Sequence, residues 1–162
     1  MKKMVVTMMI LLAAACCFAD TFTVTLVSKV EKVEAQYAIR NNETGATGAA
    51  VIYTTDAIAN QDVTTSFDII QTNKSNWGRR VAFQVSATEL VANVEGKTYS
   101  TEGVSIVMNG EQCGSSVGFV REFKGVTAAG TTVGSFEVVW QSNASLVEAT
   151  YEACITLSAT AL

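Results

Sequence analysis

Apolar and polar residues alternate one for one along much of the chain after residue 20. The clearest stretches, each with apolar side chains at every second position, span residues 21–26, 33–39, 81–87, 135–140 and 150–159. A period of two places successive side chains on opposite faces of a β-strand, one toward a core and one toward solvent. Val, Thr, Ile, Phe and Tyr, which suit a half-buried pleated surface, are abundant in these stretches. The pattern therefore predicts an all-β protein.

Shorter apolar runs predict four further strands, at residues 49–54, 63–70, 104–108 and 117–123. Turn-forming residues separate the predicted strands, and the strongest signal is Asn109-Gly110, because both residues tolerate the positive φ of a tight hairpin. Residues 87–94 are the one stretch that would accommodate a short helical turn. About seven to nine strands at this spacing predict an Ig-like β-sandwich, with a closed barrel as the alternative.

The N-terminus has the features of a signal peptide, so we expect export from the cytoplasm. Lys2 and Lys3 precede an apolar run at residues 4–15 that is too short to span a bilayer, which takes about 20 residues. Cys17 and Ala19 place small residues at positions −3 and −1 of a cut after Ala19. A buried N-terminal helix is the alternative interpretation.

A second processing site competes with the first. Residues 12–16, Leu-Ala-Ala-Ala-Cys, are similar to a bacterial lipobox, in which the cysteine is lipidated. Cys16 would then become the first residue and anchor the protein to a membrane. The sequence leaves the choice open between cleavage after Ala19 and lipidation of Cys16.

Cleavage after Ala19 leaves 143 of the 162 residues, a length that suits one domain. We expect an N-terminal extension or first strand at residues 20–30 and a β-sandwich domain at residues 31–162. Removing Lys2 and Lys3 lowers the net charge from −4 to −6. Nucleic acid and anionic membranes are poor partners for an acidic chain, because contacts to phosphate need clustered Lys and Arg. The one basic doublet after the signal, Arg79-Arg80, is expected to open a strand.

The same cleavage leaves two cysteines, Cys113 and Cys154. A single pair in an oxidising compartment predicts one disulfide, and two free thiols are the alternative. A bridge across these 41 positions would contribute about 4 kcal/mol on the chain-entropy estimate. Cys154 is out of phase with Tyr151 and Ile155, so the bridge would lie on the outer face of the last strand or beside a bulge.

Residues for catalysis are scarce, and we expect neither an enzyme nor a bound cofactor or metal. The chain has no histidine, which excludes Ser/His/Asp and Cys/His nucleophilic schemes and most zinc sites. No glycine-rich loop has the context of a phosphate-binding site. Asp56, Asp62 and Asp68 are predicted to be solvated surface charges, because they lack the regular spacing of a calcium loop. A glycosidase that uses carboxylates alone would need two inward-facing acids, and the pattern provides no such pair.

The two tryptophans have different predicted roles. Trp140 ends an alternating strand and is expected in the core. Trp77 lies in a polar loop at residues 73–80. It is either an exposed contact for a partner, since an exposed aromatic is an efficient anchor, or a ring folded back over the edge of the sandwich.

Segments at both ends of the chain resemble bacterial chaperone–usher pilins. Residues 20–30, Asp-Thr-Phe-Thr-Val-Thr-Leu-Val-Ser-Lys-Val, are similar to the alternating N-terminal extension of these pilins. Residues 144–158 are similar to their closing strand, although Ala149-Thr150 replaces the usual Gly before the Tyr. Residues 67–75 and 80–85 are similar in rhythm to the major subunits of the alpha class.

The resemblance implies an Ig-like sandwich that lacks one strand, into whose groove the N-terminal extension of the next subunit inserts. Phe22, Val24, Leu26 and Val30 would be the side chains that fill the groove. The expected partners are further copies or related subunits, a periplasmic chaperone, and a ligand on a host or cell surface. We therefore expect a structural subunit of a surface fibre, located in the periplasm, at the cell surface or secreted. The alternative is a stand-alone Ig-like binding module, secreted or lipid-anchored.

Overall fold

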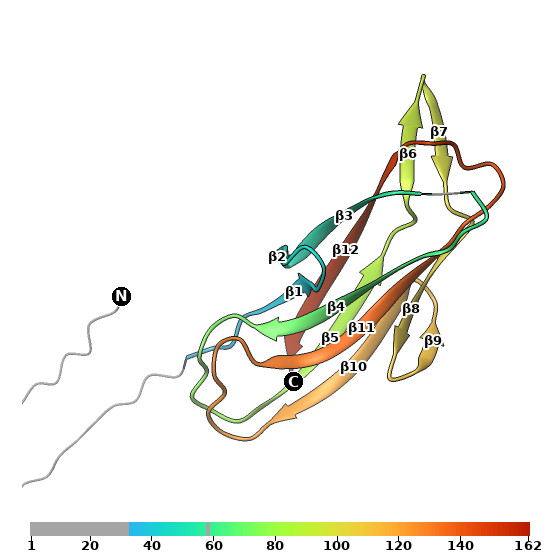
Figure 1. Cartoon of the computed structure of the whole chain (residues 1–162). Helices are drawn as coiled ribbons and strands as arrows, with labels where there is room; N and C mark the ends of the chain where they lie inside the picture. The colour runs from blue at the N-terminus through green and yellow to red at the C-terminus, as the bar shows by residue number, and fades with distance from the viewer. Residues whose placement is uncertain (1–32, 58) are drawn as a thin grey trace, which may run out of the picture. The chain divides into compact units, whose positions relative to one another are not determined.

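The computed structural model describes residues 33–57 and 59–162, and its described part is built from β-strands without a helix. The predicted signal peptide, the possible lipidation site Cys16 and the segment 20–30 with Phe22, Val24, Leu26 and Val30 lie outside the described residues. Two antiparallel sheets pack together as a β-sandwich, which confirms the predicted fold class (Figure 1).

The first sheet has six strands in the order β2 (Thr47–Gly48), β1 (Tyr37–Asn41), β4 (Val63–Gln71), β11 (Thr132–Gln141), β8 (Gly103–Met108) and β9 (Glu111–Cys113). The second sheet has the order β10 (Ser116–Phe123), β5 (Arg79–Ala87), β12 (Thr150–Ala161), β6 (Val91–Val94) and β7 (Lys97–Ser100), and β3 (Ala50–Asp56) also pairs with β12. Neighbours far apart in sequence, such as β4 with β11, make the topology predominantly non-local.

The core lies between the sheets, and alternation along the long strands supplies it. In β5, Val81, Phe83 and Val85 are buried, while the residues between them are more exposed. Aromatic rings fill the centre in pairs that combine residues from both sheets or from neighbouring strands. Tyr53 stacks on Trp140 with ring centroids 5.1 Å apart. The sandwich therefore owes its packing to the period-two pattern, as the sequence predicts.

Two tight hairpins have positive φ at both central residues, and one of them confirms the turn predicted at Asn109-Gly110. Asn109 and Gly110 have φ values of 53° and 81°, and they connect β8 to β9. Glu95 and Gly96, with φ values of 51° and 80°, connect β6 to β7 in the same way. Positive φ at both central residues matches the twist of the flanking strands, and it is cheapest for Asn and Gly.

The structure differs from the sequence expectations in three places. It has twelve strands in its described part against the seven to nine expected, and the surplus consists of β2, β6, β7 and β9, each of four residues or fewer. Residues 33–36 precede β1 and are not part of a strand. The helical turn considered for residues 87–94 is wrong, because β5 ends there and β6 begins.

Trp140 is fully buried, as predicted, and its indole Nε1 donates a hydrogen bond to the Thr88 carbonyl at 2.8 Å. Trp140→Ala leaves a cavity beside Tyr53, so we expect the free energy of unfolding to fall by about 3–5 kcal/mol. Urea denaturation measures the loss. Val126→Ala is the control, because Val126 is 64% exposed and its truncation should change stability by less than about 0.5 kcal/mol. Equal losses in the two variants would contradict the placement of Trp140 at the centre of the core.

Candidate functional site

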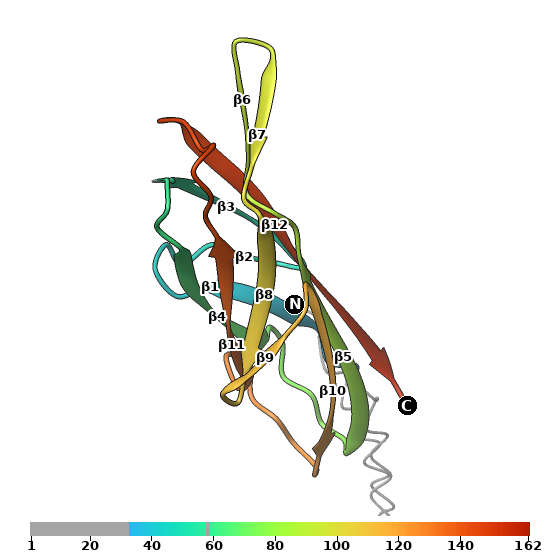
Figure 2. The same cartoon turned by 90° about the vertical axis from the view of Figure 1, so that its right-hand side faces the viewer.

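The last strand, β12, is paired along both edges for only part of its length. Residues Thr150–Thr156 pair with β3, and Ile155–Ala161 pair with β5. Ile155 faces Val51 of β3 and Ala87 of β5 at once, so these two neighbours lie on opposite edges. Figure 2 shows β12 running on past β3 toward the C-terminus. From Ser158 onward, the edge opposite β5 has no strand partner among the described residues.

The hydrogen bonds of β12 show which main-chain groups this open edge presents. The Leu157 N–H donates to the Ala49 carbonyl at 2.8 Å, on the β3 side, and the Leu162 N–H donates to the Arg80 carbonyl at 3.0 Å, on the β5 side. N–H and C=O groups of successive residues point to alternate edges of a strand. Ala159 and Ala161 therefore direct their main-chain groups to the open edge.

The core-facing side of β12 loses its cover toward the same end. Tyr151 and Ile155 are fully buried and Ala153 nearly so, Leu157 is half-buried, and Ala159 and Ala161 are exposed. All lie at alternate positions and share one face of the strand. The last two residues are therefore on the inner face of the sheet without being covered by the sandwich.

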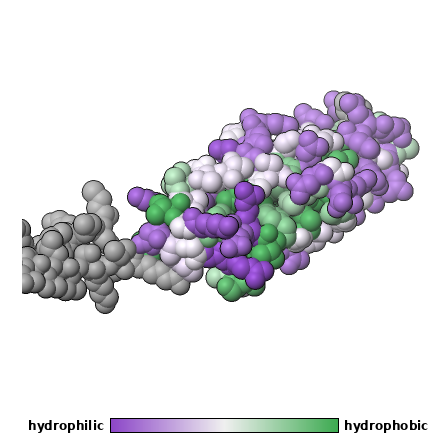
Figure 3. All heavy atoms as spheres, turned by 90° about the horizontal axis from the view of Figure 1, so that it is seen from below, coloured by the Kyte–Doolittle hydropathy of each residue, from purple (hydrophilic) through white to green (hydrophobic). Residues whose placement is uncertain are grey.

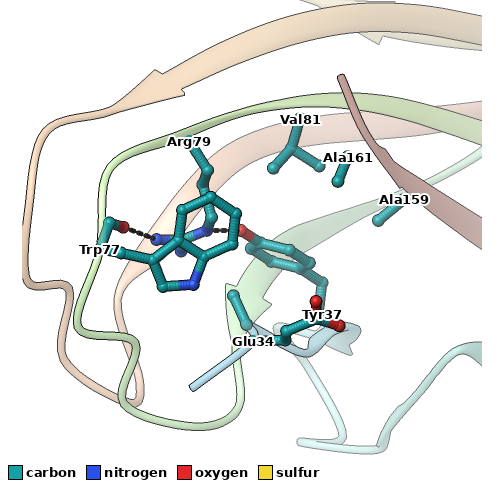
Figure 4. Close-up of a pocket in the computed structure, with 8 residues that line it drawn as sticks. Glu34, Tyr37, Trp77, Arg79, Val81, Ala159 and Ala161 are labelled. Carbon is teal, nitrogen blue, oxygen red and sulfur yellow. Dashed lines mark hydrogen bonds between the residues drawn. The ribbon is translucent and has the colours of Figure 1, made fainter. Parts of the chain in front are cut away.

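A pocket of about 170 Å³ opens beside this uncovered end. Figure 4 shows its lining, which combines residues from β1, β5, β12 and the loop before β5: Tyr37, Trp77, Arg79, Val81, Ala159 and Ala161. Val81 is directly opposite Ala161 in the sheet, and Phe83 is opposite Ala159. The pocket thus has an apolar wall of small side chains on β12 and two charged side chains, Arg79 at the start of β5 and Glu34 before β1.

Trp77 lies at the mouth of the pocket and is only partly exposed. Its indole Nε1 donates a hydrogen bond to the Val33 carbonyl at 3.0 Å. Asn73 and Asn76 of the same loop hold the adjacent backbone through their side-chain amides: the Gln36 N–H donates to Asn73 Oδ1 at 2.7 Å and the Val33 N–H to Asn76 Oδ1 at 3.0 Å. These contacts agree with the second role predicted for Trp77, a ring folded back over the edge of the sandwich.

The aspartates considered in the sequence are dispersed rather than gathered. Asp56 accepts a hydrogen bond from Thr150 Oγ1, and Asp62 accepts one from the Ser142 N–H. Asp68 lies on the outer face of the first sheet, 2.7 Å from the Arg40 guanidinium. No group of three or more His, Cys, Asp or Glu side chains suited to a metal occurs in residues 33–57 and 59–162.

Asp68 is held ionised by its neighbours. Burial alone would raise the pKa of this carboxyl, but hydrogen bonds from Ser135, Arg40 and Asn42 outweigh it, and the pKa lies below its usual value. Arg40, Asp68 and Ser135 occupy matched positions on three adjacent strands. The cluster is therefore a cross-strand ladder that ties β1 to β4 and β11, rather than a proton donor.

The predicted disulfide between Cys113 and Cys154 is not formed, and both residues are free thiols. Cys113 is opposite the fully buried Ile106, which places it on the inner side of β9 in the first sheet. Cys154 is opposite Ile52, whose side chain is 67% exposed, so it faces outward from the second sheet. The backbone of the second sheet therefore lies between the two sulfurs. They cannot form a bridge because the Cys154 side chain points outward, as its phase in the sequence predicts.

Because neither thiol is bridged to the other, a reductant should leave the free energy of unfolding of residues 20–162 unchanged. Urea denaturation with and without dithiothreitol checks this, and thiol titration of the unfolded chain should count both cysteines as free. Cys113→Ser and Cys154→Ser serve as matched single variants. A fall of about 4 kcal/mol in the free energy of unfolding on reduction would instead show that the bridge forms.

The remaining surface has no large apolar patch among its described residues. Exposed large hydrophobic side chains are distributed over separate elements: Val33, Ile52, Val120, Val126 and Leu162. On the face in Figure 3, hydrophobic areas are interspersed with hydrophilic ones. A second, more open groove of about 320 Å³ lies along the outer face of the second sheet, between β10, β5 and β12. Half of its lining residues are small or hydroxyl-bearing: Ala82, Gly118, Ser158 and Thr160.

Comparisons of the chain with protein-family models, curated proteins and solved structures gave no match. Within the described residues, no helix has the length and apolar character needed to cross a membrane. The open edge of β12 and its pocket are therefore the candidate site on geometric grounds. Sequence reasoning identified the strand and Trp77 but missed Arg79, although Arg79 has the same phase as Val81 and Phe83 and is thus on the inward face of β5.

Proposed function

We propose that this protein is a structural subunit of a surface fibre that assembles by β-strand addition. The segment 20–30 of one copy would pair with the open edge of β12 in the next copy. The observation that carries the proposal is found at the end of β12. Main-chain groups without a strand partner in residues 33–57 and 59–162 occur there together with uncovered inner-face residues, Ala159 and Ala161.

An open strand edge is a template for another chain, and proteins usually protect it with proline, a charge or a covering element. The chain contains no proline, and Ala159 and Ala161 present no charge at this edge. In β-strand addition, main-chain hydrogen bonds supply affinity and alternate side chains in pockets set the register. The end of β12 offers both kinds of contact.

The segment 20–30 has complementary features. Phe22, Val24 and Leu26 are apolar at alternate positions, and threonines occupy the positions between them. Burial of three such side chains contributes roughly 5–8 kcal/mol before the cost of ordering the segment. The small side chains of Ala159 and Ala161 leave space for larger ones from an incoming strand.

The proposal gives the protein no catalytic role and makes its partners further copies or related subunits. A subunit with an open edge needs protection before assembly, which is consistent with the periplasmic chaperone that the sequence resemblance implies. Export through the predicted signal peptide, and display at the cell surface, belong to the same proposal.

Gel filtration of the exported protein tests assembly directly. We expect multimers from the native chain and monomers after deletion of residues 20–30. A matched pair of triple variants separates the two faces of the segment: Phe22, Val24 and Leu26 changed to Asn should abolish multimers, whereas Thr21, Thr23 and Thr25 changed to Asn should retain them. If the native and deleted chains elute as indistinguishable monomers, the fibre proposal is wrong and a stand-alone binding module becomes the better interpretation.

A further inference from the structure

Arg79, at the charged end of the pocket, is a buried cation whose partners in the described part of the chain are all neutral. Only 7% of the residue is exposed. Its Nε donates to the Tyr37 hydroxyl at 2.9 Å, its Nη1 to Ser75 Oγ at 2.8 Å and to the Trp77 carbonyl at 3.1 Å, and its Nη2 to Gln71 Oε1 at 2.5 Å. The guanidinium also lies 4.2 Å from the centre of the Phe123 ring.

A buried charge without a counter-charge is costly, and a carboxylate is the usual partner of arginine in such a site. The one ion pair within 4.0 Å among the described residues joins Arg40 and Asp68 of the first sheet, so it does not involve Arg79 of the second. Glu34, which also lines the pocket, makes no ion pair with Arg79. The hydrogen bonds that hold Arg79 fix its guanidinium in the wall of the pocket that Ala159 and Ala161 also line, where an incoming carboxylate would find it preorganised.

We propose that Arg79 binds the carboxylate of Asp20 from a second copy and thereby sets the register of strand addition. This inference rests on the proposed function and specifies its alignment. Asp20, Phe22, Val24 and Leu26 lie at alternate positions, so they share one face of the incoming strand. The face that enters the pocket thus carries one acid at its leading end.

The pairing of β5 with β12 then predicts which residues of the incoming strand align with which residues of β12. Ala161 is opposite Val81, and Arg79 lies two residues before Val81 on the same face of β5. If the strand enters antiparallel to β12 with Phe22 opposite Ala161, Val24 comes opposite Ala159. Asp20, two residues before Phe22, then comes level with Arg79.

The neighbouring registers are less favourable. A slip by one residue turns the threonines inward. A slip by two in one direction brings Phe22 level with Arg79 and leaves the buried cation without an anion. A slip by two in the other direction places Val24 opposite Leu157 and Leu26 opposite Ile155, where Ala49 and Val51 already occupy the edge. In the proposed register only Leu26 reaches this occupied edge, opposite Leu157.

The pocket also accommodates Phe22 in the proposed register. Its volume is about 170 Å³, and an apolar cavity of roughly 150 Å³ is large enough for a benzene ring. The ring would lie over Ala161 on the inner face of the sheet and cover the end of the core.

Disulfide trapping between two exported chains tests the alignment, in a background in which Cys113→Ser and Cys154→Ser remove the native thiols. Val24→Cys mixed with Ala159→Cys should give a disulfide-linked dimer, identified by mass spectrometry of the linked peptides. Val24→Cys mixed with Ala161→Cys is the matched control, because that pair forms only if the strand is slipped by two residues. Preferential linkage of the control pair would overturn the register.

Asp20→Asn tests the role of the carboxylate, with Glu31→Gln as a control that removes the same charge outside the pairing segment. We expect the dissociation constant of the multimer to rise about tenfold for Asp20→Asn, the effect of one charge-assisted hydrogen bond, and to stay unchanged for Glu31→Gln. Intact mass confirms that both variants have the native N-terminus. Native affinity in Asp20→Asn would overturn the role of Arg79 while leaving strand addition intact, whereas a monomeric native chain would remove the proposed function itself.

Discussion

The pairing of β12 determines which parts of the second sheet are closed and which are open. This strand is the central element of the second sheet and contacts β3, β5 and β6. Main-chain polar groups and apolar side chains both need partners, and β12 has both kinds only along its first half. The second half is supported by β5 alone. Everything proposed about the protein follows from this asymmetry between the two halves of one strand.

The closed half is held by several independent contacts. Tyr151 is fully buried, and its hydroxyl donates to the Val147 carbonyl and accepts from the Val147 N–H, both at 3.1 Å, which fixes the turn before the strand. On the neighbouring strand β3, Tyr53 is paired with Ala153 and stacks on Trp140. β3 is thus anchored by its side chains as well as by its pairing, so an added strand would extend the sheet beyond β3 rather than replace it.

The open half is organised around Arg79 instead of an apolar residue. Gln71, Ser75, Tyr37 and the loop at residue 77 all direct acceptors to its guanidinium. A network of this kind costs desolvation and is best explained by a need for a fixed charge at this position. In the proposed assembly it supplies specificity, because a strand without a matching acid would leave the cation unpaired.

Much of the fold could be predicted from the sequence, because in long strands the alternation of apolar and polar residues shows which side chains face the core. Residues 81–87 and 150–159 indicated the inner faces of β5 and β12, and Asn109-Gly110 indicated a hairpin. Strands of two to four residues, such as β9, contain too few positions for a period to be visible. Val33 and Ala35 continue the alternation of β1, but side-chain amides of Asn73 and Asn76 bind that backbone in place of a strand.

The candidate site was only partly predictable. The sequence indicated the segment 20–30 and Trp77 because of their local composition. The unpaired edge of β12 depends instead on where β3 ends, and contacts between residues far apart in sequence determine that. The phase of Cys154 already argued against a bridge to Cys113 through the core. Arg79 was read only as the start of a strand, since a charged residue at a strand end is usually exposed.

Hydrogen exchange of the β12 amides tests whether the second half of this strand has an open edge that receives another strand. In the chain without residues 20–30, the account predicts fast exchange of the Ala159 and Ala161 amides and slow exchange of Ser158 and Thr160, whose N–H groups point to β5. Addition of a peptide with the sequence of residues 20–30 should slow Ala159 and Ala161 selectively. Amides of Ala159 and Ala161 that are already protected in the shortened chain, or that the peptide leaves unchanged, would contradict an open edge that receives a strand.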